Sequence, residues 1–155
     1  MASGDADTVL SVLTTNQKGL IAETAIIHEC AKLGVPVSRP LDDQRYDLIF
    51  DLTTDLVRVQ CKWATRHGEV VQIRCRTCRR GREGLIHRPY RDGEIDAIAA
   101  FCPDTGDCYL LPPDLSVERS MVQLRLGPTR NNQSVGIRWA ADYGFAARLK
   151  SLQGP

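Results

Sequence analysis

Three polar side chains are predicted to share one patch on a β-hairpin. Apolar and polar residues alternate from Val57 to Trp63, so Gln60 and Lys62 are neighbours on the polar face of that strand. A tight turn at residues 53–55 folds the preceding strand back and places Asp47 roughly opposite these two residues. Register decides this placement, because a slip of one residue would move Asp47 to the other face.

A second carboxylate points to the same patch. Glu23 lies on or beside the apolar stripe of a predicted helix that must face the sheet. Carboxylates and carbonyl oxygens are the ligands of hard divalent ions such as Mg²⁺, and a bound ion would relieve the cost of burying two acids. A lysine such as Lys62 can then orient or deprotonate an attacking water and balance the charge of a phosphoryl group. Taken alone, Asp47 and Lys62 could equally form an ordinary surface ion pair.

Positive charge is concentrated in the middle of the chain. Residues 58–91 carry ten Lys or Arg and two Glu, although the whole protein has a formal net charge of only +1. Most of these cations are arginines, whose planar guanidinium suits phosphate oxygens and base edges. We therefore expect a polyanionic partner on this segment; the alternative is a solvated loop whose arginines pair with acids elsewhere.

The order of predicted elements indicates an α/β or α+β fold in which helices flank a mixed β-sheet. Residues 1–13 are predicted to be a flexible lead-in, and residues 14–152 to form a single domain. Within it, residues 76–93 lack periodicity and are predicted to be a basic loop that is mobile without a partner. Helices are predicted over residues 14–33, with Leu20 in the apolar stripe, and 135–152, and strands over 35–39, 46–52, 56–64, 70–75, 95–102 and 108–111.

Composition limits the class of protein. The chain has 155 residues, of which 43% are hydrophobic and 25% charged, values typical of one globular domain. No stretch is apolar enough to span a membrane, and the first residues are small and acidic where a signal peptide would be basic and then apolar. We therefore expect a cytoplasmic protein with no membrane partner.

The cysteines offer a competing chemistry. In a reducing compartment they are expected to be free or metal-bound, not paired in disulfides. Cys75 and Cys78 have the spacing of zinc ligands, and Cys102 and Cys108 could complete a tetrahedral structural Zn²⁺ site, although their turn makes this pair a poorer match. Buried structural thiols are the alternative.

Asp47 followed by Gln60-Cys61-Lys62, with Glu23 on the preceding helix, resembles the PD-(D/E)XK nuclease core in a variant that has Gln where Asp or Glu is usual. The resemblance extends to the subfamily that contains the homing endonucleases associated with group I introns. It is carried by the following segments: Asn16-Gln-Lys-Gly-Leu-Ile-Ala-Glu23, Tyr46-Asp-Leu-Ile-Phe-Asp51, Val59-Gln-Cys-Lys62, Tyr90-Arg-Asp-Gly-Glu-Ile-Asp-Ala97, Tyr109-Leu-Leu-Pro112, Arg130-Asn-Asn-Gln133 and Ile137-Arg-Trp-Ala140.

The resemblance implies a restriction-endonuclease-like fold and metal-dependent, site-specific cleavage of double-stranded DNA. Asp47 would bind Mg²⁺ directly beside Gln60 and the backbone carbonyl of Cys61, Glu23 would hold a metal-bound water, and Lys62 would position the nucleophile. Mn²⁺ is expected to substitute for Mg²⁺. The resemblance also implies a homodimer or homotetramer, nucleoid-associated when bound to DNA.

Contacts to DNA are expected from the basic segment and from a polar stretch near the end of the chain. That polar stretch, residues 130–133, could bind a phosphate or could simply contain turn and capping residues. Two alternatives stay open for the whole protein: a nuclease selective for branched DNA, like a Holliday-junction resolvase, and a DNA-binding module that does not cut. The candidate DNA-binding residues are Arg66, Arg74, Arg76, Arg79, Arg80, Arg82, Arg88, Arg130 and Asn131.

Overall fold

The computed structural model describes residues 12–154, and of residues 79 and 80 it describes only the backbone. The predicted lead-in at residues 1–13 therefore falls almost wholly outside the described residues. The elements are α2 (Thr15–Lys32), β1 (Val37–Ser38), β2 (Leu48–Asp51), β3 (Leu56–Trp63), β4 (Thr65–His67), β5 (Val70–Arg74), β6 (Arg76–Gly81), β7 (Gly84–Pro89), β8 (Ala97–Cys102), β9 (Asp107–Leu111), α3 (Pro113–Ser116), β10 (Met121–Arg125), the 3-10 helix η1 (Ala140–Tyr143) and α4 (Phe145–Leu152).

Helix α2 is the long helix that the sequence predicted, with both ends defined by local chemistry. Thr14 and Gln17 form a capping box at its start, with side-chain to backbone hydrogen bonds of 2.8 and 3.2 Å. Gly34, at φ +70°, closes its C-terminal end in the left-handed conformation. Ile26 and Cys30 are buried against the sheet, whereas Leu20, expected in the same stripe, is 57% exposed.

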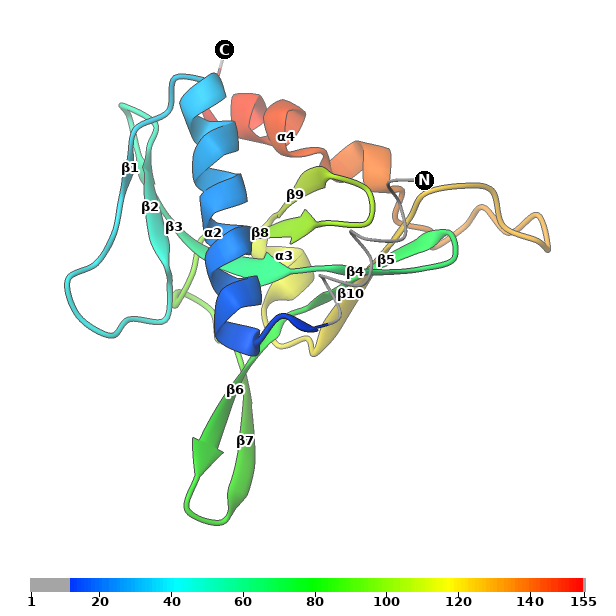
Figure 1. Ribbon diagram of the computed structural model, residues 1–155. Helices are drawn as coiled ribbons and strands as arrows, with labels where there is room; N and C mark the ends of the chain where they lie inside the picture. Colours follow the sequence, from blue (N-terminus) through cyan, green and yellow to red (C-terminus); the bar gives the residue numbers. More distant parts are fainter. Residues whose placement is uncertain (1–11, 155) are drawn as a thin grey trace.

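A mixed five-stranded sheet in the order β1-β2-β3-β8-β9 forms the centre of the protein (Figure 1). β2 and β3 make the predicted antiparallel hairpin, in which Leu48 pairs with Val59, and β3 pairs with β8 in parallel. The predicted alternation of β3 is confirmed, because Val57, Val59 and Cys61 are buried on one face. This register places Asp47, one residue before β2, opposite Gln60.

Two hydrophobic clusters cover the two faces of this sheet. Helices α2 and α4 pack on one face through Ile26, Cys30, Phe145 and Leu149. A smaller sheet in the order β10-β5-β4 covers the other face. β8 contributes to both clusters, as its continuous apolar sequence predicted. The expected fold class, a mixed sheet flanked by helices, is therefore confirmed, with an additional β-layer that the sequence reading missed.

The basic segment at residues 76–93 was wrongly predicted to be an irregular loop. Residues 76–89 form the two-stranded hairpin β6–β7, which projects from the body of the protein (Figure 1). Its turn lies between Gly81 and Gly84. Because this hairpin has no hydrophobic face of its own to bury, its sequence lacks the apolar alternation by which strands are usually found.

The C-terminal helix was predicted too long. α4 begins only at Phe145, because Gly144 has the extended backbone angles φ −54° and ψ 134°. The residues before it form η1 and an irregular segment in which Gly136 takes φ +77°. Within the described residues, no helix has the length and apolarity that crossing a membrane requires.

Candidate active site

Asp47 is fixed at the start of β2 by two hydrogen bonds to β3. Its backbone N–H donates to the carbonyl of Val59, and its Oδ2 accepts from the backbone N–H of Cys61, each at 2.9 Å. Burial raises the pKa of the Asp47 carboxyl, while the Cys61 hydrogen bond and the charge of Lys62 act in the opposite direction. The register slip that would have removed Asp47 from the patch does not occur.

Glu23 approaches the same site from helix α2. Its side chain is 23% exposed and forms an ion pair with Arg39, whose Nη2 lies 3.2 Å from Oε2. Burial, followed by the charge of Asp47, raises the pKa of Glu23, and Arg39 opposes the shift. The two carboxylates are thus close enough to repel one another, as the helical position of Glu23 predicted.

Lys62 lies beneath the arginine-rich hairpin. Its Nζ donates to the backbone carbonyl of Arg76 at 3.2 Å and lies 5.1 Å from the centre of the buried Tyr90 ring. Burial lowers the pKa of Lys62, although the charge of Asp47 partly offsets that effect. A lysine with a lowered pKa can exchange a proton with a nearby water more easily than an exposed one.

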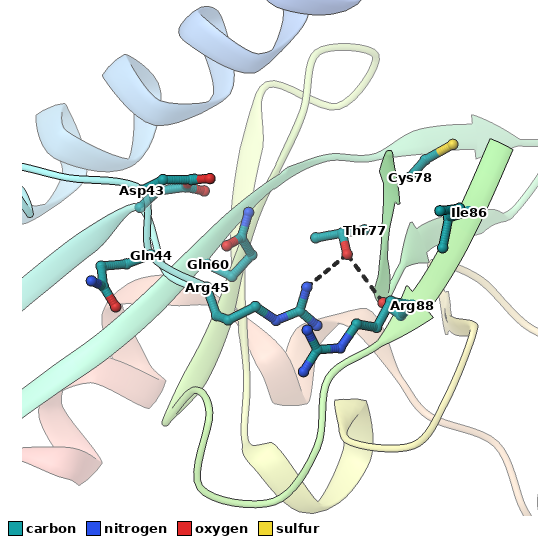
Figure 2. A pocket seen from close by; sticks show the side chains of 9 residues that line it. Asp43, Gln44, Arg45, Gln60, Thr77, Cys78, Ile86 and Arg88 are labelled. Atoms are coloured by element: carbon teal, nitrogen blue, oxygen red, sulfur yellow. Dashed lines mark hydrogen bonds between the residues drawn. The ribbon is translucent and has the colours of Figure 1, made fainter. Parts of the chain in front are cut away.

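A groove of about 590 Å³ joins Asp47 to the hairpin, and Glu23 and Lys62 are not among its lining residues. Asp47 and Gln60 line it on the side of the main sheet, and Thr77, Ile86 and Arg88 line it on the side of the hairpin. Figure 2 shows Gln60 and the hairpin side chains on opposite sides of this space. A polyanion in the groove would therefore meet Asp47 and the hairpin together.

The donor set suits a hard divalent cation. Asp47, Glu23 and Gln60 offer carboxylate and amide oxygens, and the raised pKa values of the two acids show that a neighbouring positive charge would stabilise them. Within residues 12–154, no three His, Cys, Asp or Glu side chains are grouped closely enough to hold a metal ion. Any cation held here therefore needs oxygens from Gln60, the backbone or water beside the two carboxylates.

The structure does not group the four cysteines of the zinc interpretation, all of which lie in the described part of the chain. Cys75 is buried in the cluster beneath the small sheet and Cys78 is exposed on β6. Cys102 belongs to the cluster on one face of the main sheet, whereas Cys108 packs against the cluster on the other face. Cys102 and Cys108 point to opposite faces because Cys108 pairs with Phe101, and Phe101 and Cys102 are successive residues of β8.

The candidate DNA-binding residues fall into two regions. Arg74 is exposed at the end of β5, Arg76 begins β6, Arg82 is exposed in the hairpin turn, and Arg88 on β7 pairs with Glu94 at 2.6 Å. The positions of Arg79 and Arg80 are on β6, but their side chains lie outside what the structure describes.

The second region lies around the β4–β5 turn. Arg66 is bound there to Gly68 and Glu69. The segment after β10 packs on this turn through a hydrogen bond between Leu126 and Glu69. Further along that segment, Arg130 and Asn131 are exposed. The structure therefore does not join these residues to the hairpin in one patch.

Sequence reasoning missed several residues that surround the site. Arg45, two residues before Asp47, stacks on Tyr90 and bonds to Glu94. Arg39 pairs with Glu23. Tyr90 and Glu94 belong to a segment that carried the family resemblance, and that resemblance was the sequence signal that could have identified them. Nothing in the sequence pattern around Arg39 indicated that it pairs with Glu23.

Comparisons with known proteins agree with this geometry. The sequence matches the family model described as PD-(D/E)XK endonuclease over residues 13–146. Among solved structures, the bacterial homing endonuclease I-Ssp6803I is similar, with a TM-score of 0.73 and 27% sequence identity over 92% of this chain and 96% of that chain. No curated protein matches. The resemblance read from the sequence is confirmed, and the chain belongs to the PD-(D/E)XK endonuclease family.

Proposed function

We propose that the protein is an Mg²⁺-dependent endonuclease that cuts double-stranded DNA at specific sites, with Mn²⁺ able to replace Mg²⁺. The observation that carries the proposal is the convergence of Asp47, Gln60 and Lys62 at one end of β3, next to a groove covered by an arginine-rich hairpin. The similarity to a bacterial homing endonuclease supports a site-specific rather than a general nuclease.

Nucleases of this family generally use divalent metal ions. In this chain Asp47, Gln60 and the carbonyl of Cys61 would hold the ion directly and Glu23 through a water, and the ion would supply positive charge to the phosphoryl oxygens. The Cys61 amide fixes the orientation of the Asp47 carboxylate through its 2.9 Å hydrogen bond.

The remaining chemistry falls to Lys62 and Glu23. The Lys62 ammonium, whose pKa is lowered by burial, would orient the attacking water through Nζ and exchange a proton with it. Glu23 would contribute to the cation site by holding a water bound to the ion. Because Gln60 replaces an acid, this site has one negative charge fewer than the common family pattern, which favours a single bound cation.

The arginines of the hairpin supply the affinity for the DNA backbone. Arg82 is exposed at the hairpin turn and Arg88 lines the groove, so both can face phosphates of a duplex that enters it. A two-stranded β-ribbon also has the dimensions to enter the major groove.

We further propose that the protein works as a homodimer or homotetramer. Cutting both strands of a duplex needs two active sites, and one chain contains a single set of Asp47 and Lys62. Sedimentation equilibrium of the protein, with and without duplex DNA, tests this proposal. A monomer in both states would contradict it.

The proposed function is tested by incubating the protein with a randomised or genomic duplex library in Mg²⁺ or in EDTA and sequencing the cut ends. Cuts at one recurring sequence that need Mg²⁺ support the proposal. A parallel incubation with a synthetic four-way junction identifies a branched-DNA nuclease if only the junction is cut. Binding without any cleavage would contradict nuclease activity and identify a DNA-binding module.

A further inference from the structure

One guanidinium holds the base of the β6–β7 hairpin. Arg45 donates from Nη1 to Thr77 Oγ1 at 2.8 Å and from Nη2 to the carbonyl of Pro89 at 3.1 Å, so it contacts both strands of the hairpin (Figure 2 shows the first bond). Its Nε also lies 3.2 Å from Oε2 of Glu94, just beyond the hairpin. We call Arg45, Thr77, Pro89 and Glu94 the hairpin clamp.

The clamp is reinforced by further contacts of its own members. Thr77 Oγ1 also donates to the carbonyl of Arg88 across the hairpin at 3.2 Å. Glu94 accepts from Nη2 of Arg88 at 2.6 Å and from the backbone N–H of Arg91 at 2.9 Å. The side chains of Arg45 and Glu94 are only 25% and 19% exposed, which limits their screening by water.

The hairpin depends on this clamp because it has little else to hold it. β6 and β7 form a sheet of their own, in which neither strand pairs with another described strand. No described residue of the hairpin belongs to either hydrophobic cluster, although Cys75 and Tyr90 at its two ends do. An isolated two-stranded hairpin is only marginally stable in water, so its orientation depends on the contacts at its base, where the clamp supplies most of the polar ones.

The same contacts reach the catalytic residues. Arg45 is two residues before Asp47 in the chain, and its guanidinium stacks on the Tyr90 ring at 4.6 Å from the centre. Lys62 lies 5.1 Å from the centre of that ring and donates to the carbonyl of Arg76, the first residue of β6. The hairpin base is therefore bonded to β3 and to the segment that leads through Asp47 into β2.

We propose that Arg45 is a positioning residue, which fixes the β6–β7 hairpin over the groove so that bound DNA presents its backbone to Asp47 and Lys62. The proposal rests on the proposed function for its substrate. Arg45 lines the groove but need not touch the DNA to act, because each of its three guanidinium nitrogens already bonds to Thr77, Pro89 or Glu94. Its effect is to limit the hairpin to one orientation relative to the reacting groups.

Two consequences distinguish positioning from general stability. A hairpin released from its clamp still carries its arginines and can still bind DNA, so affinity should fall little. The rate of cleavage from bound DNA should fall much more, because a displacement of about 1 Å at the reacting centre can cost on the order of a hundredfold in rate.

The test compares Arg45→Ala with Arg58→Ala. Arg58 is a matched control because it also forms an ion pair, with Nε 3.0 Å from Asp96, and lies on the strand that carries Gln60 and Lys62. Among the described residues, its side-chain hydrogen bonds go to Asp96 and not to the hairpin. Thr77→Val is a milder second variant, in case Arg45→Ala fails to fold. It removes the Thr77 hydroxyl, which accepts from Arg45 and donates to the carbonyl of Arg88, and leaves the other bonds of Arg45 in place.

Three quantities are measured for each variant. The first is hydrogen exchange of the backbone amides in residues 76–89 of the metal-free protein, followed by mass spectrometry. The second is affinity for a duplex that the wild-type protein cuts, measured in EDTA. The third is the single-turnover cleavage rate of that duplex at saturating protein in Mg²⁺.

For Arg45→Ala we expect exchange in the hairpin to be about fivefold faster or more, since several partly buried hydrogen bonds are lost. Affinity should change less than about threefold and the cleavage rate should fall at least about tenfold. Thr77→Val should shift in the same direction by less, and Arg58→Ala should leave all three quantities near wild type.

Other results would overturn the proposal. Unchanged exchange in residues 76–89 would show that Arg45 does not hold the hairpin, and a loss of affinity equal to the loss of rate would make Arg45 a binding residue. Equal losses in Arg58→Ala would indicate general destabilisation. If the wild-type protein cuts no duplex, the proposed function fails, and amide exchange still decides whether Arg45 holds the hairpin.

Discussion

Arg39 and Glu23 form an ion pair, with Nη2 of the arginine 3.2 Å from Oε2 of the glutamate. The carboxylate of Asp47 lies near this pair. In the metal-free protein, a guanidinium thus partly neutralises a group expected to contact a metal-bound water. Burial raises the pKa of Asp47, and the charge of the same guanidinium is among the effects that oppose this rise.

Removal of the Arg39 guanidinium is expected to strengthen the binding of a divalent metal ion. Arg39→Gln takes away a positive charge that opposes a divalent ion at Asp47 and Glu23. Because Arg39 is 52% exposed, the effect is limited to about a fivefold gain in affinity. Titration with Mn²⁺, followed by the EPR signal of the free ion, measures it. Weaker Mn²⁺ binding in the variant would instead show that Arg39 orients Glu23 for the metal.

The buried charge of Asp47 is expected to lower stability near neutral pH. Burial raises the pKa of this carboxyl in the folded protein, so its proton stabilises the fold at low pH and that contribution is lost as pH rises through the raised pKa. Asp47→Asn, which is neutral at every pH, should therefore raise the melting temperature at pH 7 in EDTA by about 2–4 °C.

This stability difference has two internal controls. The gain should shrink as the pH is lowered toward the ordinary carboxyl pKa, because the wild-type group then becomes protonated too. Added Mg²⁺ should raise the melting temperature of the wild-type protein but not that of Asp47→Asn, since only a ligand that binds the folded state stabilises it. Equal stabilisation of both proteins by Mg²⁺ would place the cation elsewhere.

The hairpin arginines are expected to set the salt dependence of DNA binding. Arg82→Ala removes one exposed cation from the hairpin turn, and should weaken binding and reduce the slope of log affinity against log salt concentration by about one. Lys150→Ala is the control, because it removes one exposed charge from α4, at the opposite end of the molecule from the hairpin (Figure 1). Equal slopes for the two variants would contradict a DNA surface on the hairpin.

The centre of the site could be predicted from sequence because its geometry is local. Asp47 and Gln60 lie on two strands joined by a short turn, and the alternation of β3 fixes which residues share a face. Helical spacing likewise placed Glu23 toward the sheet. In each case a period of two or 3.6 residues converts sequence position directly into direction.

The surroundings of the site could not be predicted in the same way. Arg45 and Glu94 are separated by 49 positions, and no periodic pattern connects them. The hairpin was missed because its residues are mostly polar, and helix α4 was predicted too long because apolar residues before Gly144 mimic a helical stripe. The separation of Cys102 from Cys108 depends on the strand pairing of β8 and β9, which spacing alone does not give.

The assignment of the hydrolytic site is tested most directly by single-turnover cleavage of a duplex that the wild-type protein cuts, using Asp47→Asn and Lys62→Met, with DNA affinity measured in EDTA. Both variants should lose cleavage by at least about a thousandfold, since each removes a group placed at the reacting phosphate. Both should bind the duplex within about threefold of wild type, because affinity rests on the arginines. Cleavage that persists in either variant, with normal folding, would contradict the assignment of the active site.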